Sequence, residues 1–127
     1  MPTWHWPPET GFEPSCFEKI IDPEKNILLE PRAEKETVIT PPVLRRMRQL
    51  LRSSVSYGTS RKADVLGRPV YGKTGTSNDA ADAWFIGFDD TLVVGVWVGR
   101  DKRISIGEGE TGSTAALPIW VEFMKKY

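Results

Sequence analysis

The sequence has very few of the side chains that bind metals or form disulfides. Its 127 residues include one cysteine, Cys16, and one histidine, His5. A single cysteine cannot form an internal disulfide or build a thiolate cluster for zinc or iron–sulfur. A single histidine in a proline-rich segment argues against a site in which a histidine base activates a nucleophile. We therefore expect no metal and no organic cofactor, and we interpret Cys16 as a small buried hydrophobe at the head of a strand.

Net charge and long apolar runs are also lacking. Seventeen Lys and Arg balance seventeen Asp and Glu, so no long-range field attracts nucleic acid or anionic lipid to the chain. The longest apolar run, Leu92 to Val98, contains Gly95 and is far shorter than the roughly 20 residues that span a bilayer. The N-terminal region does not have the form of a secretion signal. We expect no nucleic-acid partner, no membrane segment in this chain, and any membrane anchor to lie outside it.

Prolines and turn-forming residues divide the chain. Residues 1–15 contain four prolines and no periodic pattern, which predicts an extended arm without regular structure. Residues 16–127 are expected to form the folded part. Within it, short apolar stretches at 16–21 and 27–30 flank the turn-forming residues 22–26, which is the pattern of a β-hairpin.

A helix is predicted to begin at Thr40, because prolines follow it and proline is well tolerated in a first helical turn. Apolar residues then recur at helical spacing as far as Gly58 and predict a buried stripe: Leu44, Met47, Leu51 and Val55. The opposite face carries Arg45, Arg46, Arg48 and Arg52. Since the whole chain is neutral, we interpret these arginines as a solvated face rather than a phosphate-binding ridge.

Three strands are predicted in quick succession, at 70–77, 82–88 and 92–99. Only short turns can join them, so they are expected to form an antiparallel meander. The third is apolar on both faces, which predicts that both are covered. Loops are expected at 59–69 and 100–113, and a helix with a broad apolar face over 114–126. The core is expected to include Trp84, Trp97 and Trp120. These elements predict an α+β fold in which helices pack on an antiparallel sheet.

The most informative segment, residues 67–79, allows two incompatible interpretations. Its first part, Gly67 to Thr74, fits the G-x-x-x-x-G-K-T pattern of a phosphate-binding loop. Such a loop needs a buried strand before it and a helix directly after it, because the helix N-terminus helps to bind the phosphates. Here the preceding residues are too polar and the following ones are poor helix formers. A small P-loop nucleotide hydrolase is therefore the weaker hypothesis, and an antiparallel strand through Thr76 would exclude it.

The second interpretation places Lys73-Thr-Gly-Thr on a strand. Alternation along that strand sends Lys73 and Gly75 to one face and Thr74 and Thr76 to the other. With the segments that follow, the strand resembles the C-terminal part of the transpeptidase domain of class A penicillin-binding proteins. The similar segments are Tyr71-Gly-Lys-Thr-Gly-Thr-Ser-Asn-Asp, Asp82-Ala-Trp-Phe-Ile-Gly-Phe, Leu92-Val-Val-Gly-Val-Trp-Val-Gly, Thr111-Gly-Ser with Leu117-Pro-Ile-Trp, and upstream Thr10-Gly-Phe-Glu-Pro-Ser and Arg52 to Leu66 with its Tyr-Gly-Thr.

The resemblance implies acyl transfer on peptidoglycan stem peptides that end in D-Ala-D-Ala. A serine would attack the penultimate carbonyl, release the last alanine and pass the acyl group to the amine of a neighbouring peptide. Penicillin and other β-lactams would acylate the same serine. The family works with three motifs that converge in one cleft, S-x-x-K, S-x-N and K-T-G.

The same resemblance assigns roles to four residues of the strand. Lys73 would supply positive charge for the substrate carboxylate and for the proton network around the nucleophile. Thr74 and Thr76 would offer hydroxyl groups to that carboxylate. Gly75 would let the substrate backbone approach and pair along the strand edge. The Thr76 N–H would be one oxyanion-hole donor. Asp82 could either hold the turn after the strand or reach into the cleft.

The other two family motifs, S-x-x-K and S-x-N, do not occur in this sequence. The chain therefore resembles the last third of a transpeptidase domain, and without the nucleophile we expect it to be inactive alone. The favoured hypothesis is a fragment of a D,D-transpeptidase at the periplasmic face of the bacterial cytoplasmic membrane, completed by the missing upstream part of the domain. Such a fragment should expose apolar surface on the third strand and the last helix. The alternative is a non-catalytic cell-envelope module that binds peptidoglycan or another protein.

Overall fold

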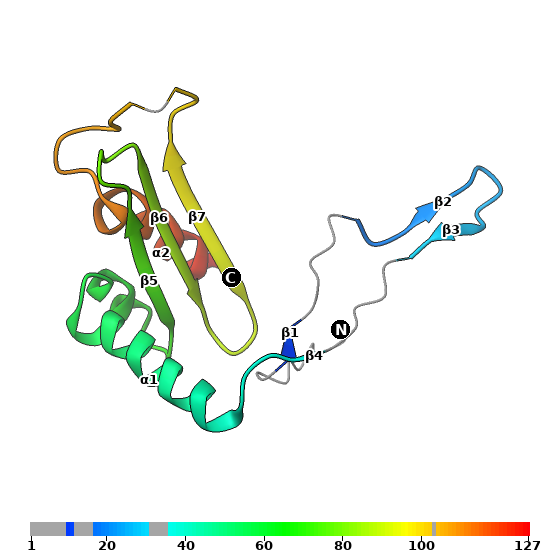
Figure 1. Cartoon of the computed structure of the whole chain (residues 1–127), viewed down its shortest axis with the longest axis horizontal. Coiled ribbons are helices and arrows are strands. Elements are labelled where there is room, and N and C mark those ends of the chain that lie inside the picture. Colours follow the sequence, from blue (N-terminus) through cyan, green and yellow to red (C-terminus); the bar gives the residue numbers. More distant parts are fainter. Residues whose placement is uncertain (1–9, 12–16, 31–35, 103) are drawn as a thin grey trace. The chain divides into compact units, whose positions relative to one another are not determined.

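The structure, a computed structural model, describes residues 10–11, 17–30, 36–102 and 104–127. The described residues up to Leu44 belong to one compact unit, and those from Arg45 onward form another. Figure 1 shows the order of the elements along the chain. The second of these units contains the Lys73 strand and every contact on which the functional argument depends.

The first unit contains two small antiparallel strand pairs. In the predicted hairpin, β2 (Ile20–Ile21) pairs with β3 (Ile27–Leu29), and the Asp22 carboxylate accepts hydrogen bonds from the main-chain and side-chain amides of Asn26 at 2.7 and 2.8 Å. The hairpin prediction is therefore confirmed. Cys16 and most of the arm predicted at residues 1–15 lie outside the described residues.

One part of the predicted arm does form regular structure. The strand β1 (Thr10–Gly11) pairs with β4 (Glu36–Thr37) in antiparallel fashion. The prediction that residues 1–15 lack regular elements was therefore wrong at these two positions. An extended segment forms a ladder wherever another extended segment runs beside it, and a local sequence pattern does not reveal that distant partner.

The helix α1 (Pro41–Tyr57) has the predicted limits, but it packs through a different face. Val55 alone among its residues is fully buried, whereas Met47 is 45% exposed. Its contacts come from Arg48, which meets Tyr71 of β5, from Arg52, which binds Asp64 and the Val70 carbonyl, and from Val55, which joins the core. These three residues share one face at spacings of four and three. The predicted apolar stripe was therefore wrong at Met47. The long arginine side chains cover apolar surface with their methylene groups while their charged ends bind partners.

A short helix occupies most of the loop predicted at 59–69. This 3₁₀ helix, η1 (Arg61–Leu66), ends at Gly67, whose φ of 64° lies in the left-handed region that glycine adopts readily. Ala63 on η1 is completely buried. The loop prediction was wrong because burial of one small side chain fixes a helical turn that polar composition alone does not favour.

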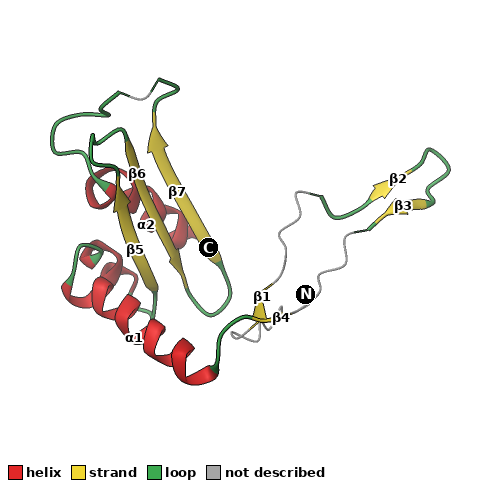
Figure 2. Ribbon diagram, viewed as in Figure 1, coloured by secondary structure: helices red, strands yellow, loops and turns green. Residues whose placement is uncertain are grey.

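The three predicted strands form one antiparallel sheet in the order β5-β6-β7, which confirms the meander (Figure 2). The strands are β5 (Tyr71–Thr76), β6 (Asp82–Phe88) and β7 (Val93–Gly99). In the β6–β7 turn the Asp89 carboxylate accepts hydrogen bonds from Thr91 and Leu92. Burial alone would raise the pKa of Asp89, but these hydrogen bonds and the Arg68 guanidinium lower it below its ordinary value.

The core lies between one face of the sheet and the C-terminal helix. A π-helical turn, η2 (Gly112–Ala116), leads into α2 (Leu117–Lys126), and Pro118 lies in the first turn of α2, where it is tolerated. The largest buried side chains of this layer are Phe85, Leu117, Trp120 and Met124. The prediction that Trp120 belongs to the core is confirmed, as is the α+β fold.

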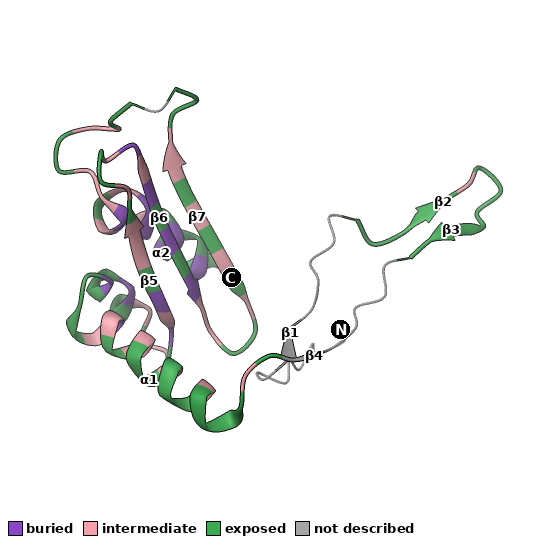
Figure 3. Cartoon of the chain, in the orientation of Figure 1, coloured by how far each residue is buried: buried purple, intermediate pink, exposed green. Residues whose placement is uncertain are grey.

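The opposite face of the sheet carries exposed apolar side chains. Figure 3 shows exposed residues alternating with more buried ones along β6 and β7. The exposed fractions are 69% for Val93, 53% for Ile86, 47% for Trp97 and 43% for Trp84. Two predictions were wrong here, that β7 is covered on both faces and that Trp84 and Trp97 lie in the core. Among the described residues, η2 and α2 pack on the buried face, and from α1 the Arg48 side chain reaches the Tyr71 ring at one end of the open face. An apolar pattern identifies a face without showing what covers it.

Candidate functional site

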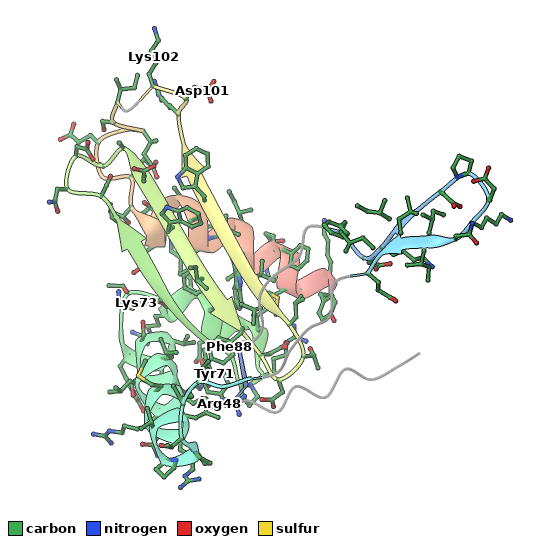
Figure 4. The ribbon with its side chains drawn as sticks, turned by 45° about the vertical axis from the view of Figure 1, so that its right-hand side comes forward. Arg48, Tyr71, Lys73, Phe88, Asp101 and Lys102 are labelled. Carbon is green, nitrogen blue, oxygen red and sulfur yellow. The ribbon has the colours of Figure 1, made fainter. Side chains whose placement is uncertain are left out.

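Lys73 lies on β5, an edge strand of the three-stranded sheet (Figure 4). In the register of the sheet, Lys73 pairs with Ile86 and Gly75 pairs with Trp84, both of which lie on the exposed face. Thr74 pairs with Phe85 of the buried core. The predicted alternation is confirmed, because lysine and glycine share the open face while the two threonines lie on the face that packs against helices.

The Lys73 ammonium group has hydrogen-bond partners but no counter-charge among the residues that the structure describes. Its Nζ atom donates to the Thr74 carbonyl oxygen at 3.0 Å and to Thr74 Oγ1 at 3.3 Å. Within the described part of the chain, no carboxylate lies at ion-pair distance from it. The side chain is exposed. This positive charge is therefore available to an anionic ligand at the strand edge.

The contact between Lys73 and the Thr74 carbonyl also shows how the edge is oriented. In an antiparallel sheet, successive residues direct their N–H and C=O groups alternately toward and away from a given neighbour. The Thr74 carbonyl meets the ammonium, which indicates that it points away from β6. Thr76, two residues later, then directs its N–H and C=O groups to the same open edge. An extended peptide could pair with β5 there.

The start of η2 holds the end of β5 in place. Thr76 Oγ1 accepts a hydrogen bond from the Gly112 N–H at 3.0 Å, which leaves the Thr76 hydroxyl proton free to donate. Gly112 is buried, and a Cβ atom there would lie 2.7 Å from the Gly75 carbonyl oxygen. A capping box between Thr111 and Thr114 fixes this first turn. The Thr76 backbone is thus supported from the buried side of the sheet.

Sequence reasoning missed the residue that contacts Thr74. Thr59, in the loop between α1 and η1, places its Oγ1 atom 2.8 Å from Thr74 Oγ1. The family resemblance of the segment Tyr57-Gly-Thr gives Thr59 no role, and no pattern links it to Thr74, because the pair is separated by fifteen positions and depends on how α1 packs beside β5. The polar loop composition was the one available signal, and it does not specify a partner.

Two arginines of α1 anchor the beginning of β5 rather than lying free in solvent. The Arg48 guanidinium is 4.7 Å from the centre of the Tyr71 ring, which stacks on Phe88 at 5.1 Å, and Arg48 also pairs with Asp90. Figure 4 shows Arg48, Tyr71 and Phe88 gathered at one end of the sheet. The solvated-face prediction was therefore wrong for Arg48.

The prediction of a solvated arginine face was also wrong for Arg52, which donates to the Val70 carbonyl at 3.4 Å and to Asp64 at 3.1 Å. These contacts join α1 and η1 to the residue that precedes β5. The two arginines thus fix the strand relative to the helix that carries the Thr59 loop.

Asp82 holds the turn after the strand and does not contact Lys73. Its main-chain N–H donates to Ser77 Oγ at 2.9 Å, and its Oδ1 accepts a hydrogen bond from Trp97 Nε1 at 2.9 Å. Of the two roles that the sequence left open, the structural one is observed. The contact also fixes the orientation of the exposed Trp97 ring.

The phosphate-loop interpretation of Gly67 to Thr74 is excluded by the backbone. The strand β5 runs antiparallel to β6 through Thr76, so no helix begins after Thr74. A phosphate-binding loop requires that helix N-terminus.

Two glycines of β5 differ in what a side chain would meet. A Cβ atom on Gly72 would lie 2.9 Å from the Ile86 carbonyl oxygen, whereas one on Gly75 would lie 3.4 Å from Trp84 Cβ, an ordinary contact. Internal packing therefore requires glycine at position 72 but not at 75. A requirement for glycine at position 75 would come from a ligand that approaches the open face.

We expect Gly72→Ala to lower the free energy of unfolding by about 1–3 kcal/mol, because the added methyl group meets backbone atoms that cannot move aside. Gly75→Ala should change it by less than about 0.5 kcal/mol. Urea unfolding of the two variants beside the parent chain measures the difference. Equal losses in both variants would contradict the assignment of Gly75 to an open face.

Among the described residues, no cluster of His, Cys, Asp or Glu is arranged to hold a metal ion. None of the described helices has the length and apolar character needed to cross a membrane.

Comparison with known proteins connects this geometry to one family. The family described as the penicillin binding protein transpeptidase domain matches residues 10–124. Penicillin-binding protein 1A of Aquifex aeolicus is 46% identical over 116 residues, which make up 91% of this chain and 16% of that protein. Penicillin-binding protein 1A of Pseudomonas aeruginosa is 37% identical over 117 residues, 91% of this chain and 12% of that protein. The chain thus spans less than a fifth of the length of these relatives.

Solved structures share the fold. The crystal structure of penicillin-binding protein 1A from Haemophilus influenzae matches with a TM-score of 0.80 and 24% identity, covering 93% of this chain and 24% of that one. The D,D-transpeptidase domain of a peptidoglycan glycosyltransferase from Eggerthella lenta matches with a TM-score of 0.69 and 20% identity, covering 94% of this chain and 28% of that one.

Proposed function

The chain belongs to the penicillin-binding protein transpeptidase domain family, and on that premise we propose that it supplies the substrate-binding strand of a D,D-transpeptidase. The site would cross-link peptidoglycan stem peptides that end in D-Ala-D-Ala. The observation that carries this proposal is the exposed Lys73 ammonium on an open strand edge, with which no carboxylate of the described residues forms an ion pair. An anionic, extended peptide fits that combination of charge and free backbone groups.

Three residues of β5, Lys73, Gly75 and Thr76, have roles in the proposed reaction. The C-terminal carboxylate of the stem peptide binds beside Lys73, and the Thr76 hydroxyl has a proton left to donate to it. The peptide backbone pairs with the free edge of β5 and passes over Gly75. The Thr76 N–H donates to the oxyanion that forms when a serine attacks the penultimate carbonyl. Collapse of that intermediate releases D-alanine and leaves an acyl-serine, which the amine of a second stem peptide then attacks.

The nucleophile comes from outside this sequence in our proposal. The sequence contains no S-x-x-K and no S-x-N motif, so the upstream part of the same domain would supply the serine and its lysine. The exposed apolar groups support this arrangement, since Val93 and Trp97 on β7, and Ile119 and Phe123 on α2, are each about half exposed or more. Apolar surface of that kind is expected where further protein packs. Alone, the chain is proposed to be inactive.

The proposed partners follow from the same premise. They are the peptidoglycan stem peptide, β-lactams that mimic its D-Ala-D-Ala end, and the upstream part of the domain. Such a protein works in the cell envelope, at the periplasmic face of the bacterial cytoplasmic membrane. The proposal requires neither a metal nor an organic cofactor.

The test is a hybrid protein in which this chain follows a segment of a penicillin-binding protein that contains the S-x-x-K and S-x-N motifs. We expect the hybrid to release D-alanine from a stem pentapeptide, and the chain alone to release none. Replacing the S-x-x-K serine of the hybrid by alanine is the matched control and should abolish release. A folded hybrid without activity would contradict the proposal and favour a non-catalytic envelope module.

A further inference from the structure

The loop that follows α1 brings an unassigned hydroxyl group to the Lys73 edge. Thr59 is exposed, and its Oγ1 atom lies 2.8 Å from Thr74 Oγ1, which itself lies 3.3 Å from the Lys73 ammonium nitrogen. Three polar groups from two elements therefore form one continuous hydrogen-bonded chain. The family resemblance assigns roles to Lys73 and Thr74 but none to Thr59.

The chemistry of the groups fixes the direction of the first of these hydrogen bonds and allows one direction of the second that leaves a donor at the exposed end. An ammonium group can only donate, so Thr74 Oγ1 accepts from Lys73. The Thr74 hydroxyl proton can then be donated to Thr59 Oγ1, and in that arrangement Thr59 Oγ1 is the acceptor. Thr59 keeps its own hydroxyl proton, and this proton lies at the exposed end of the chain. The positive charge of Lys73 polarises the series and makes Thr59 a stronger donor.

The loop that carries Thr59 is fixed before any ligand binds. The N–H groups of Gly58 and Ser60 donate to the Ser54 carbonyl at 3.1 and 3.2 Å, and the Ser60 hydroxyl, completely buried, lies 3.1 Å from Ser54 Oγ. A Cβ atom on Gly58 would lie 2.9 Å from the Ser54 carbonyl oxygen, so glycine lets the loop turn closely over the helix end. A donor held in this way loses little conformational entropy on binding.

We propose that Thr59 is a substrate-binding residue, whose hydroxyl donates to the carboxylate of the peptide bound beside Lys73. This inference rests on the proposed function, because it takes the C-terminal carboxylate of a D-Ala-D-Ala peptide as the anion. It extends the binding edge from β5 to the loop between α1 and η1. The site then presents an ammonium group and hydroxyl donors from two separate elements to one carboxylate.

The test is a titration of the isotope-labelled chain with acetyl-D-Ala-D-Ala, followed by NMR at the amide resonances of Thr74 and Thr76. We expect Thr59→Val to weaken binding about tenfold, the effect of removing one hydrogen bond to a charged group. Thr59→Ser keeps the hydroxyl and should bind within about twofold of the parent chain. The same peptide with an amidated C-terminus is the ligand control, and Thr59→Val should not change its weaker binding.

The outcomes separate this inference from the function on which it rests. Unchanged binding of the acid peptide by Thr59→Val, equal weakening of the acid and amide peptides, or failure of Thr59→Ser to restore binding would each overturn the role of Thr59. The function itself is tested by Lys73→Met in the same titration. If the parent chain bound neither peptide, or if Lys73→Met bound the acid as well as the parent does, the proposed function and the inference would both be overturned.

Discussion

Replacing Trp120 by alanine is expected to lower the free energy of unfolding by about 3–5 kcal/mol. Trp120 is completely buried, its ring meets Phe85 edge to face at 5.0 Å, and its Nε1 donates to the Val94 carbonyl at 3.2 Å. It thereby joins α2 to both β6 and β7. Alanine would leave a large cavity and an unpaired carbonyl group. Urea unfolding at 25 °C measures the loss as a shift of the midpoint at constant slope.

Trp84→Ala is the matched control for that measurement. The same side chain is removed, but Trp84 is 43% exposed on the open face and meets only the tilted Trp97 ring at 6.3 Å among the aromatic groups described. We expect a loss of about 1 kcal/mol. If the two variants lost equal stability, the core would not be confined to the α2 side of the sheet, contrary to the arrangement described above.

The second large effect is expected at Lys73. In the hybrid protein that carries the S-x-x-K and S-x-N motifs, Lys73→Met should reduce the rate of D-alanine release by about 10²–10³-fold. Methionine keeps most of the side-chain volume and removes the charge. The ammonium is the one group of the K-T-G-T segment that can neutralise a carboxylate. It also orients Thr74 through its contact at 3.3 Å. The measurement is the rate of release from a stem pentapeptide.

Lys102→Met provides the control, because Lys102 is an exposed lysine in the loop after β7, well away from Lys73 (Figure 4). The activity of this variant should equal that of the hybrid. If Lys73→Met kept more than about a third of the activity, the assignment of Lys73 to the substrate-binding site would be contradicted. Lys73→Arg tests geometry separately, since a guanidinium keeps the charge but is broader and planar.

Local patterns were sufficient to predict the sheet and the faces of its edge strand. The apolar runs and short turns defined β5, β6 and β7, and strict alternation placed Lys73 and Gly75 on the face opposite Thr74 and Thr76. These features depend on neighbours within a few positions. The limits of α1 were predictable for the same reason, because proline at one end and glycine at the other act locally.

Contacts between distant elements could not be predicted from such patterns. The rotation of α1, which turns Arg48 and Arg52 toward the sheet, depends on Tyr71 and Asp64, which lie on β5 and η1. The pairing of Thr59 with Thr74 has the same origin. The exposure of Trp97 was missed because β7 carries apolar residues on both of its faces. Such a pattern does not distinguish a covered face from an open one.

The central claim, that this chain contributes the substrate-binding strand but not the nucleophile, is tested most directly by benzylpenicillin. The chain alone and the hybrid protein are each incubated with excess antibiotic, and their intact masses are measured. The account predicts that the hybrid gains the mass of one penicillin molecule and that the chain alone gains none. An adduct on the chain alone, located on one of its own serines by peptide mapping, would contradict the account, as would a folded hybrid that remains unmodified.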